Sequence, residues 1–305
     1  MDTTAQLSYG ATGQGVRGDY STMAPDWTCD QAYGAYTPTE HERYRRLYAA
    51  RSAHIRDQAC EDFLQALARL DADQALARLD ADQALPRFDD ISRRLRRATG
   101  WELAAVPGLI PEAAFFTLLA QRRFPVTTWL REEHEFNYIV EPDIFHDFFG
   151  HVPLLFNPVF ADYMQAYGAG GMKAHRLAQQ DPARYGGALE CLARLYWYTV
   201  EFGLIQTSSG LRIYGAGILS SDSEPVYALH DPRPQRIAFQ RDRVMQSRYH
   251  IDRFQDTYFV IESIEQLFEA TAPDFTPVYE RLQGAEPYAE NIVLPDERVY
   301  PPEPR

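Results

Sequence analysis

Two histidines and a glutamate are the residues of this chain whose types and spacing point most directly to chemistry. His146 and His151 lie in the segment Glu141-Pro-Asp-Ile-Phe-His-Asp-Phe-Phe-Gly-His-Val-Pro. Glu201 follows fifty residues after His151, in the segment Leu195-Tyr-Trp-Tyr-Thr-Val-Glu-Phe-Gly. Two imidazoles and one carboxylate among apolar neighbours are typical of a metal with open coordination positions, as in mononuclear iron(II) sites that activate oxygen. The three residues therefore predict an oxygenase, which also needs a substrate pocket and a source of electrons.

The spacing of the two histidines differs from that of the helix motif in zinc proteases. On a regular α-helix, residues five positions apart are rotated by about 500°, so His146 and His151 would point about 140° away from each other. Histidines four apart share one face in His-Glu-x-x-His, and that motif carries a catalytic glutamate that is missing here. Gly150 therefore predicts that the helix ends or bulges before His151 and redirects its ring, and Pro153 disfavours continuation.

A second glutamate competes with Glu201 for the third ligand position. Glu190 lies eleven residues earlier on the same expected helix and shares its face, but the two α-carbons would be about 16 Å apart. We select Glu201, because it lies in an apolar run where an unpaired carboxylate would be costly to bury. The residues alone leave open zinc in place of iron. They also leave open a purely structural role, in which the histidines bond to backbone carbonyls.

Local sequence signals predict the helices that position these residues. Thr37-Pro-Thr-Glu40 is a capping box that begins a helix running to about Arg56. A second helix is expected from about Ala59 into the low eighties. It contains a nine-residue duplication, 66–74 repeated as 75–83, to which we assign no function. Further helices are expected in 88–99 closed by Gly100, in 111–123 with Pro111 at N1, in the histidine segment, and in 182–202.

β-structure is expected only in two short stretches, 211–220 and 257–262. The sequence therefore predicts a mainly α fold, a single domain of packed helices with a small β component. We expect a flexible N-terminal tail over 1–26, the catalytic domain over 27–284 and a Pro-rich C-terminal tail over 285–305.

Composition argues against several classes of partner. The net charge of -13 opposes binding to nucleic acid or to anionic membranes. No apolar run approaches the roughly 20 residues of a membrane span, and the N-terminal residues have no apolar signal core. Cys29, Cys60 and Cys191 build no disulfide framework, which favours a reducing cytoplasm. The sequence has no sustained heptads of the kind that form an oligomerisation helix, so we expect a monomer.

Three long segments of the chain resemble the aromatic amino acid hydroxylase family. They are Glu141 to Leu154, Ala193 to Leu204, and Tyr214-Gly-Ala-Gly-Ile-Leu-Ser-Ser221, within a resemblance that covers roughly 39–276. The resemblance implies the catalytic fold of that family, with iron(II) bound by the two histidines and Glu201. It also implies a tetrahydropterin cosubstrate and dioxygen.

The resemblance assigns a group of residues to the pterin. The pterin ring would stack on Phe115, and backbone groups of Gly108 and Ile110 would contact it. Asp147, which replaces the glutamate common in animal members, would reach the pterin through water, and Tyr196 belongs to the same group. Without the resemblance, Phe115 would be interpreted as a core residue and Gly108 as part of an ordinary turn.

The resemblance assigns a second group to an amino acid substrate. Arg131 would hold the substrate carboxylate in a bidentate fork, with Ser220 near the same end. Trp197 would flank the aromatic ring, and Tyr138 would line the entrance. Without the resemblance, Arg131 would be interpreted as a surface ion-pair partner and Trp197 as a core residue.

The activity expected from the resemblance is the conversion of L-phenylalanine to L-tyrosine, a step in phenylalanine catabolism. Hydroxylation of tryptophan or tyrosine is the alternative within the family, because pocket volume decides between the three amino acids. A zinc-dependent hydrolase that uses the same three ligands is the alternative from another class. We expect neither the regulatory domain nor the tetramerisation helix of the animal enzymes.

Overall fold

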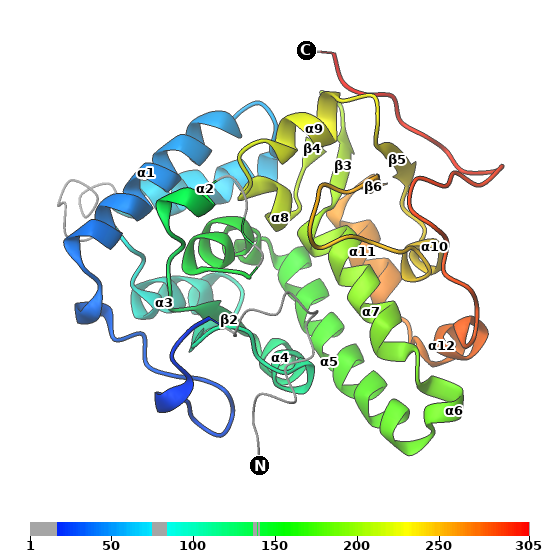
Figure 1. Ribbon diagram of the computed structural model, residues 1–305, viewed down its shortest axis with the longest axis horizontal. Coiled ribbons are helices and arrows are strands. Elements are labelled where there is room, and N and C mark those ends of the chain that lie inside the picture. The colour runs from blue at the N-terminus through cyan, green and yellow to red at the C-terminus, as the bar shows by residue number, and fades with distance from the viewer. Residues whose placement is uncertain (1–16, 75–83, 137–138, 140, 305) are drawn as a thin grey trace.

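Helices dominate the computed structural model, which describes residues 17–74, 84–136, 139 and 141–304 (Figure 1). The α-helices are α1 (Pro38–His54), α2 (Glu61–Gln74), α3 (Phe88–Ala98), α4 (Glu112–Ala120), α5 (Pro158–Gln180), α6 (Pro182–Tyr185), α7 (Ala188–Tyr196), α8 (Ala216–Leu219), α9 (Glu224–His230), α10 (Arg241–Met245), α11 (Ile264–Thr271) and α12 (Thr276–Leu282). Two π-helices span His146–His151 and Trp197–Glu201. Within the described ranges, no helix combines the length and apolar character needed to cross a membrane.

Two small sheets complete the fold and confirm the mainly α prediction. In the first, β1 (Glu102–Val106) pairs in parallel with β2 (Arg123–Thr127), and α4 connects the two strands. The second sheet has the order β4-β3-β6-β5, and its strands are β3 (Leu204–Thr207), β4 (Gly210–Ile213), β5 (Gln235–Ala238) and β6 (Thr257–Ile261). In open parallel sheets, ligands bind beyond the carboxyl ends of the strands. The β1–α4–β2 unit places the loop after β1 and Thr127 at such an end.

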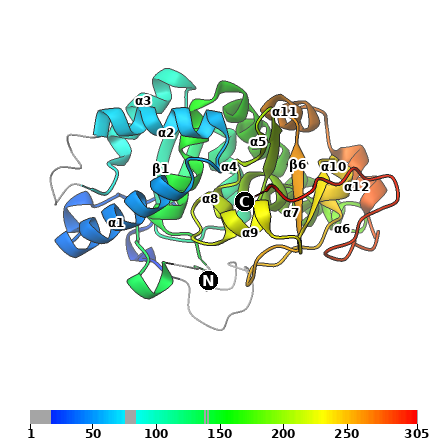
Figure 2. The same ribbon diagram turned by 90° about the horizontal axis from the view of Figure 1, so that it is seen from above.

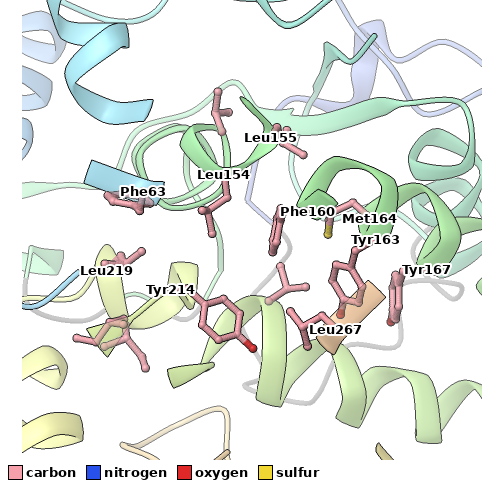
Figure 3. Close-up of a cluster of buried hydrophobic side chains, with 14 of the residues drawn as sticks. Phe63, Leu154, Leu155, Phe160, Tyr163, Met164, Tyr167, Tyr214, Leu219 and Leu267 are labelled. Carbon is pink, nitrogen blue, oxygen red and sulfur yellow. The ribbon is translucent and has the colours of Figure 1, made fainter. Parts of the chain in front are cut away.

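The long helix α5 runs through the molecule beside α4, α7 and α11 (Figures 1 and 2). Its start is capped by Asn157, whose side chain accepts hydrogen bonds from the N–H groups of Val159 and Phe160. One face of α5 packs into the core with side chains from α2, α8 and α11 (Figure 3). The labelled core residues are Phe63, Leu154, Leu155, Phe160, Tyr163, Met164, Tyr167, Tyr214, Leu219 and Leu267. This packing holds in place the two π-helices that carry the three predicted metal ligands.

The predicted start of α1 is confirmed. Thr37 Oγ1 accepts a hydrogen bond from the N–H of Glu40, and Glu40 Oε2 accepts one from the N–H of Thr37 at 2.8 Å. The end of α3 is also as predicted, because Gly100 follows it with a φ of 78°. The first copy of the duplication, 66–74, lies in α2, whereas the second copy, 75–83, lies outside the described residues.

The prediction of one continuous helix over 182–202 is wrong. The chain forms α6, then α7, and then the π-helix Trp197–Glu201. The break falls at Gly186 and Gly187, where two consecutive glycines destabilise helical backbone because they lose the most conformational freedom on folding. Along α7, Leu192 and Leu195 are nonetheless buried, and Leu189 is partly buried.

Two other predicted elements have different bounds. Pro111 is the N-cap residue of α4 rather than N1, and the helix ends at Ala120, so that Arg123 begins β2. The expected strand over 211–220 ends at Ile213, and the chain then turns into α8. The stretch 257–262 forms β6 as expected, with its last strand residue at Ile261.

Both segments outside the predicted catalytic domain contact it in their described parts. Near the N-terminus, the hydroxyl of Tyr20 donates a hydrogen bond to the carbonyl of Leu109 at 2.9 Å. Near the C-terminus, Val299 forms an antiparallel bridge with Ile237 in β5, and the Tyr300 side chain is buried. The boundaries at residues 26 and 284 stay predictions.

Candidate metal centre and active site

A π-helix brings the two predicted histidine ligands onto one face. Hydrogen bonds in a π-helix link residues five positions apart, so His146 and His151 lie one turn from each other. Their ring centroids are 5.0 Å apart and their Nε2 atoms 3.3 Å apart. The prediction of a bulge near Gly150 is therefore confirmed. Gly150 also allows close packing against α8, because a Cβ at this position would lie 2.9 Å from the Cβ of Ala216.

Glu201 completes this group from the second π-helix. Its Oε1 lies 3.2 Å from Nε2 of His151, and its Oε2 lies 3.5 Å from Nε2 of His146. Ligand-type atoms of these three residues all lie within 4.8 Å of one another, and they form the one such group found in the described part of the chain. The rival Glu190 instead forms an ion pair with Arg194, and its side chain is 66% exposed. The geometry brings Glu201, and not Glu190, together with the two histidines.

Burial and the neighbouring charges set the protonation of the three groups. Burial lowers the pKa of His146 to about 4, so its imidazole is neutral. Its Nδ1 lies 2.8 Å from Oγ of Ser220, and its Nε2 lies on the side of Glu201, where it is available to a metal. Burial opposes charge on both His151 and Glu201, but their mutual attraction outweighs it, raising the histidine pKa and lowering the glutamate pKa. Two imidazole nitrogens and one carboxylate fit an iron(II) ion.

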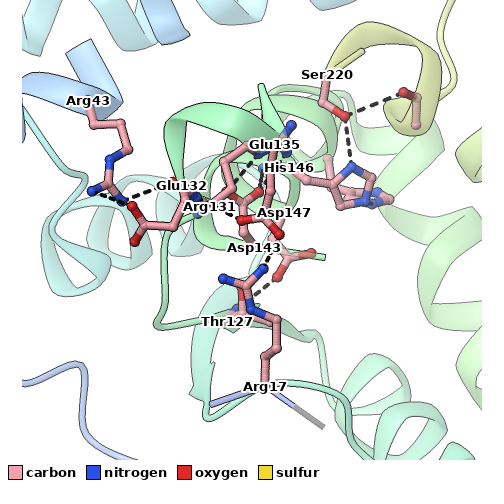
Figure 4. A network of polar contacts seen from close by, with 12 residues as sticks. Arg17, Arg43, Thr127, Arg131, Glu132, Glu135, Asp143, His146, Asp147 and Ser220 are labelled. Atoms are coloured by element: carbon pink, nitrogen blue, oxygen red, sulfur yellow. Dashed lines mark hydrogen bonds and ion pairs between the residues drawn. The ribbon is translucent and has the colours of Figure 1, made fainter. Parts of the chain in front are cut away.

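Arg131 is fully enclosed and bound to a carboxylate that the sequence analysis did not identify (Figure 4). Asp143 accepts hydrogen bonds from Nε of Arg131 at 2.9 Å and from Nη2 at 2.7 Å. A substrate carboxylate would therefore have to use the Nη1 side of the guanidinium. Asp143 also accepts from the N–H of His146 at 2.9 Å. Asp143 directly precedes the helical run that begins at Ile144, and a side chain at such an N-cap position accepts from the N–H three residues later.

Two of the residues assigned to the pterin lie in a row of rings that leads to the metal ligands. The ring of Phe115, on α4, meets that of Tyr196 edge to face, with centroids 5.5 Å apart. The ring of Tyr196 is nearly parallel to that of His151, with centroids 6.4 Å apart. Phe115 is only partly buried. The structure therefore brings Phe115 and Tyr196 together beside the metal centre.

The other residues assigned to the pterin lie at the carboxyl end of the β1–α4–β2 unit. Gly108 and Ile110 lie in the loop between β1 and α4, and Ile110 is buried. Asp147 is buried and accepts a hydrogen bond from the N–H of Thr127 at 2.8 Å. Burial raises the pKa of Asp147 to about 7, against the opposing effect of the Thr127 N–H. Thr127 was not identified from the sequence, because the parallel strand that positions it was not predicted.

The residues assigned to the amino acid substrate are only partly assembled among the described residues. The ring of Trp197 stacks on that of Tyr249 and is tilted by 34° to that of Phe202, with ring centroids 4.6 Å and 4.7 Å away. Ser220 contacts the ligand His146, a contact that the sequence did not predict. Tyr138 lies outside the described residues.

The family of the chain follows from a match to known sequences. Residues 21–283 match the model of the family described as biopterin-dependent aromatic amino acid hydroxylase. The chain belongs to this family. The predicted family is thereby confirmed, together with its dependence on a biopterin.

Individual members of the family are similar in both sequence and structure. The phenylalanine-4-hydroxylases of Ralstonia nicotianae and Chromobacterium violaceum are 54% and 52% identical to the chain, over 87% and 90% of its length and 79% and 87% of theirs. A crystal structure of the Chromobacterium violaceum enzyme with bound oxidised Fe(III) has a TM-score of 0.83 at 51% identity. The match covers 92% of this chain and 96% of the chain in that crystal structure. A second, with iron(III) and 7,8-dihydrobiopterin, has a TM-score of 0.82 at 50% identity and covers 92% and 95%. The fold prediction is confirmed by this agreement.

Proposed function

We propose that the protein is a monooxygenase that converts L-phenylalanine to L-tyrosine with iron(II), a tetrahydropterin and dioxygen. The observation that carries the proposal is the buried group of His146, His151 and Glu201 in a member of the biopterin-dependent family. Relatives at 54% and 52% identity are named phenylalanine-4-hydroxylases, which supports phenylalanine over tryptophan and tyrosine. The reaction belongs to phenylalanine catabolism.

The metal would be held by Nε2 of both histidines and the carboxylate of Glu201. When bound, iron supplies the activation of dioxygen, with electrons from the pterin. The protein fixes the direction of the first imidazole through the contact between His146 Nδ1 and Ser220 Oγ. The apolar rings around the group, including Phe124 at 5.1 Å from His151, limit the access of water.

The pterin would lie between the loop after β1 and the row of rings that leads to His151. Phe115 offers the stacking surface, and Tyr196 closes the side nearer to the metal. Backbone groups of Gly108 and Ile110 would hydrogen-bond the pterin ring. Asp147 would act through water, because its carboxylate is already bound to the backbone of β2. The shared position of these groups at one end of the β1–α4–β2 unit supports this assignment.

The amino acid would be oriented by Arg131 at its carboxylate and by Trp197 at its ring. Asp143 holds the guanidinium rigidly, so the Nη1 side is presented to the substrate without loss of side-chain freedom on binding. The contacts of Trp197 with Tyr249 and Phe202 fix the indole in the same way. Ser220 and Tyr138 complete the proposed substrate site.

Turnover assays with the three aromatic amino acids test the proposed substrate. We expect kcat/KM with iron and a tetrahydropterin to be highest for phenylalanine, with tyrosine as the product. A higher kcat/KM for tryptophan, or for tyrosine, would overturn this assignment. The family match does not support the alternative function of a zinc-dependent hydrolase. Hydrolytic activity with zinc in the absence of oxygen would support that alternative.

We extend the proposal to a monomer in the cytoplasm that binds no nucleic acid. The net charge of -13 supports the last point, because phosphate backbones would be repelled. Sedimentation velocity at micromolar concentration should give a single species of about 35 kDa, the mass of one chain. A dimer or tetramer under these conditions would contradict the proposed state.

A further inference from the structure

The segment Arg17–Tyr20 lies directly against the loop that follows β1. Gly18 has a φ of 112°, and a Cβ on it would lie 2.0 Å from the carbonyl oxygen of Pro107. A Cβ on Gly108 would in turn lie 2.3 Å from the carbonyl oxygen of Arg17. No side chain fits between the two backbones, so the segment and the loop touch along their main chains.

A side-chain hydrogen bond fixes the same contact. The hydroxyl of Tyr20 donates to the carbonyl of Leu109 at 2.9 Å, and burial raises the pKa of this phenol, which keeps it a donor. Further along the chain, Trp27 packs onto the cluster that contains Ile110, and the N–H of Cys29 donates to Ala105 in β1 at 2.9 Å. The N-terminal residues thus cover the outer side of the loop over several contacts.

The segment Arg17–Tyr20 also contacts Trp129, Glu135 and Glu141, which lie on either side of Arg131 in the chain. The N–H of Arg17 donates to Oε2 of Glu141 at 3.1 Å. The guanidinium of Arg17 pairs with Glu135 and lies 4.0 Å from the ring centroid of Trp129 (Figure 4). Arg17 and Tyr20, three residues apart, therefore contact two different parts of the site.

We propose that Arg17–Tyr20, called here the N-terminal clasp, is a positioning element that joins the pterin-binding loop (107–110) to the substrate-binding stretch (129–135). The proposal rests on the proposed function for the roles of these two parts. Loops that bind ligands lose conformational freedom on binding, and contacts that order them beforehand reduce this loss. The Tyr20 side of the clasp supports tetrahydropterin binding, and the Arg17 side supports phenylalanine binding.

The replacement Tyr20→Phe in the full chain tests the pterin side, because it removes only the hydroxyl that bonds to Leu109. The loss of one buried hydrogen bond should raise the Kd for tetrahydrobiopterin about 2-fold to 10-fold, measured by anaerobic titration calorimetry. The KM for the pterin should rise with it, while kcat stays within about 2-fold of the parent. Ser21→Ala is the matched control, since Ser21 is exposed and its hydroxyl bonds to Asp19, two residues earlier, and not to the pterin-binding loop.

The replacement Arg17→Gln tests the other side. It removes the ion pair with Glu135 and should raise the KM for phenylalanine more than the KM for the pterin. Gly18→Ala should raise both KM values, because the added Cβ displaces the clasp from Pro107. Thermal unfolding of each variant checks the fold, and the isosteric Tyr20→Phe keeps the test valid even if Gly18→Ala does not fold.

Two failures are distinguishable. If the parent enzyme does not bind tetrahydrobiopterin, the proposed function fails. If the parent binds it and Tyr20→Phe has the same Kd as Ser21→Ala, the clasp proposal alone is overturned. Equal effects of Tyr20→Phe and Arg17→Gln on both KM values would overturn the division of the clasp into two sides.

Discussion

The replacement Asp143→Asn should destabilise the protein and weaken phenylalanine binding together. Asp143 is fully buried and accepts hydrogen bonds from the N–H, Nε and Nη2 of Arg131 and from the N–H of His146. An asparagine keeps one acceptor oxygen, but its NH₂ group is a donor and would face the N–H donors of Arg131 and His146. The guanidinium of Arg131 also loses its counter-charge. Breaking a buried ion pair at one partner costs about 3–5 kcal/mol. At roughly 2 °C per kcal/mol for a larger domain, we expect the Tm to fall by about 6–10 °C.

The assay for this prediction combines thermal unfolding with steady-state kinetics. The KM for phenylalanine should rise at least about 10-fold, because Arg131 is no longer held in place, and each factor of ten corresponds to about 1.4 kcal/mol. The KM for the pterin should change much less. The double variant Arg131→Met/Asp143→Leu serves as the control, since an apolar pair recovers the part of the stability lost with the unpaired charge while the substrate contact stays lost.

A parent-like Tm and phenylalanine KM for Asp143→Asn would refute this reasoning. A fall in Tm with an unchanged KM would separate the two effects, and it would show that the Nη1 side of Arg131 does not hold the substrate. A double variant that is stable and still binds phenylalanine would lead to the same conclusion.

Four further predictions concern the metal ligands and the pH dependence of stability. Glu201→Ala should abolish stoichiometric iron binding and tyrosine formation, whereas Glu190→Ala, at an exposed ion pair, should bind iron like the parent. Ser220→Ala should weaken iron binding about 10-fold to 100-fold, measured by chelator competition, because His146 Nδ1 loses its partner. Glu224 is buried, and burial raises its pKa to about 7. The folded state therefore binds this proton more tightly than the unfolded state, so stability falls as pH rises from about 4.5 to about 7, by up to about 3 kcal/mol. Urea unfolding of Glu224→Gln should lack this part of the pH dependence; an identical pH profile would contradict the assignment.

Local signals were sufficient to predict some elements of this fold. The reciprocal hydrogen bonds of Thr37 and Glu40 involve residues three positions apart, so the sequence contains the whole capping box. The redirection of His151 was predicted from Gly150, since two ligands on one metal require a bulge at that spacing. The distance between Glu190 and Glu201 followed from helix rise alone and showed that only one of them can reach the metal. The apolar run around Glu201 favoured it, and the structure places it beside the histidines.

Features that depend on distant partners were not predictable. β1 and β2 are five-residue strands that pair with each other across α4, and short apolar runs do not separate strand from helix. The binding of Asp147 to Thr127 depends on that pairing. The burial of Arg131 against Asp143 also followed only from the fold, because a sequence run of Trp-Leu-Arg-Glu-Glu is equally compatible with an exposed ion pair.

The roles of the pterin-assigned and substrate-assigned residues came from the family resemblance and not from spacing. The structure supports them by proximity for Phe115 and Tyr196, whose rings lead to His151. For Ser220, it adds a contact with a metal ligand that the resemblance did not supply. Distances between side chains from separate elements are the information that a single sequence lacks.

Metal reconstitution tests the central claim most directly. The metal-free protein should be supplied with one equivalent of either iron(II) or zinc(II), then mixed with phenylalanine, a tetrahydropterin and oxygen. We predict tyrosine formation coupled to oxygen consumption with iron and none with zinc, and no activity with either metal in Glu201→Ala. Activity with zinc in the absence of oxygen, or iron-dependent tyrosine formation that persists in Glu201→Ala, would contradict the account.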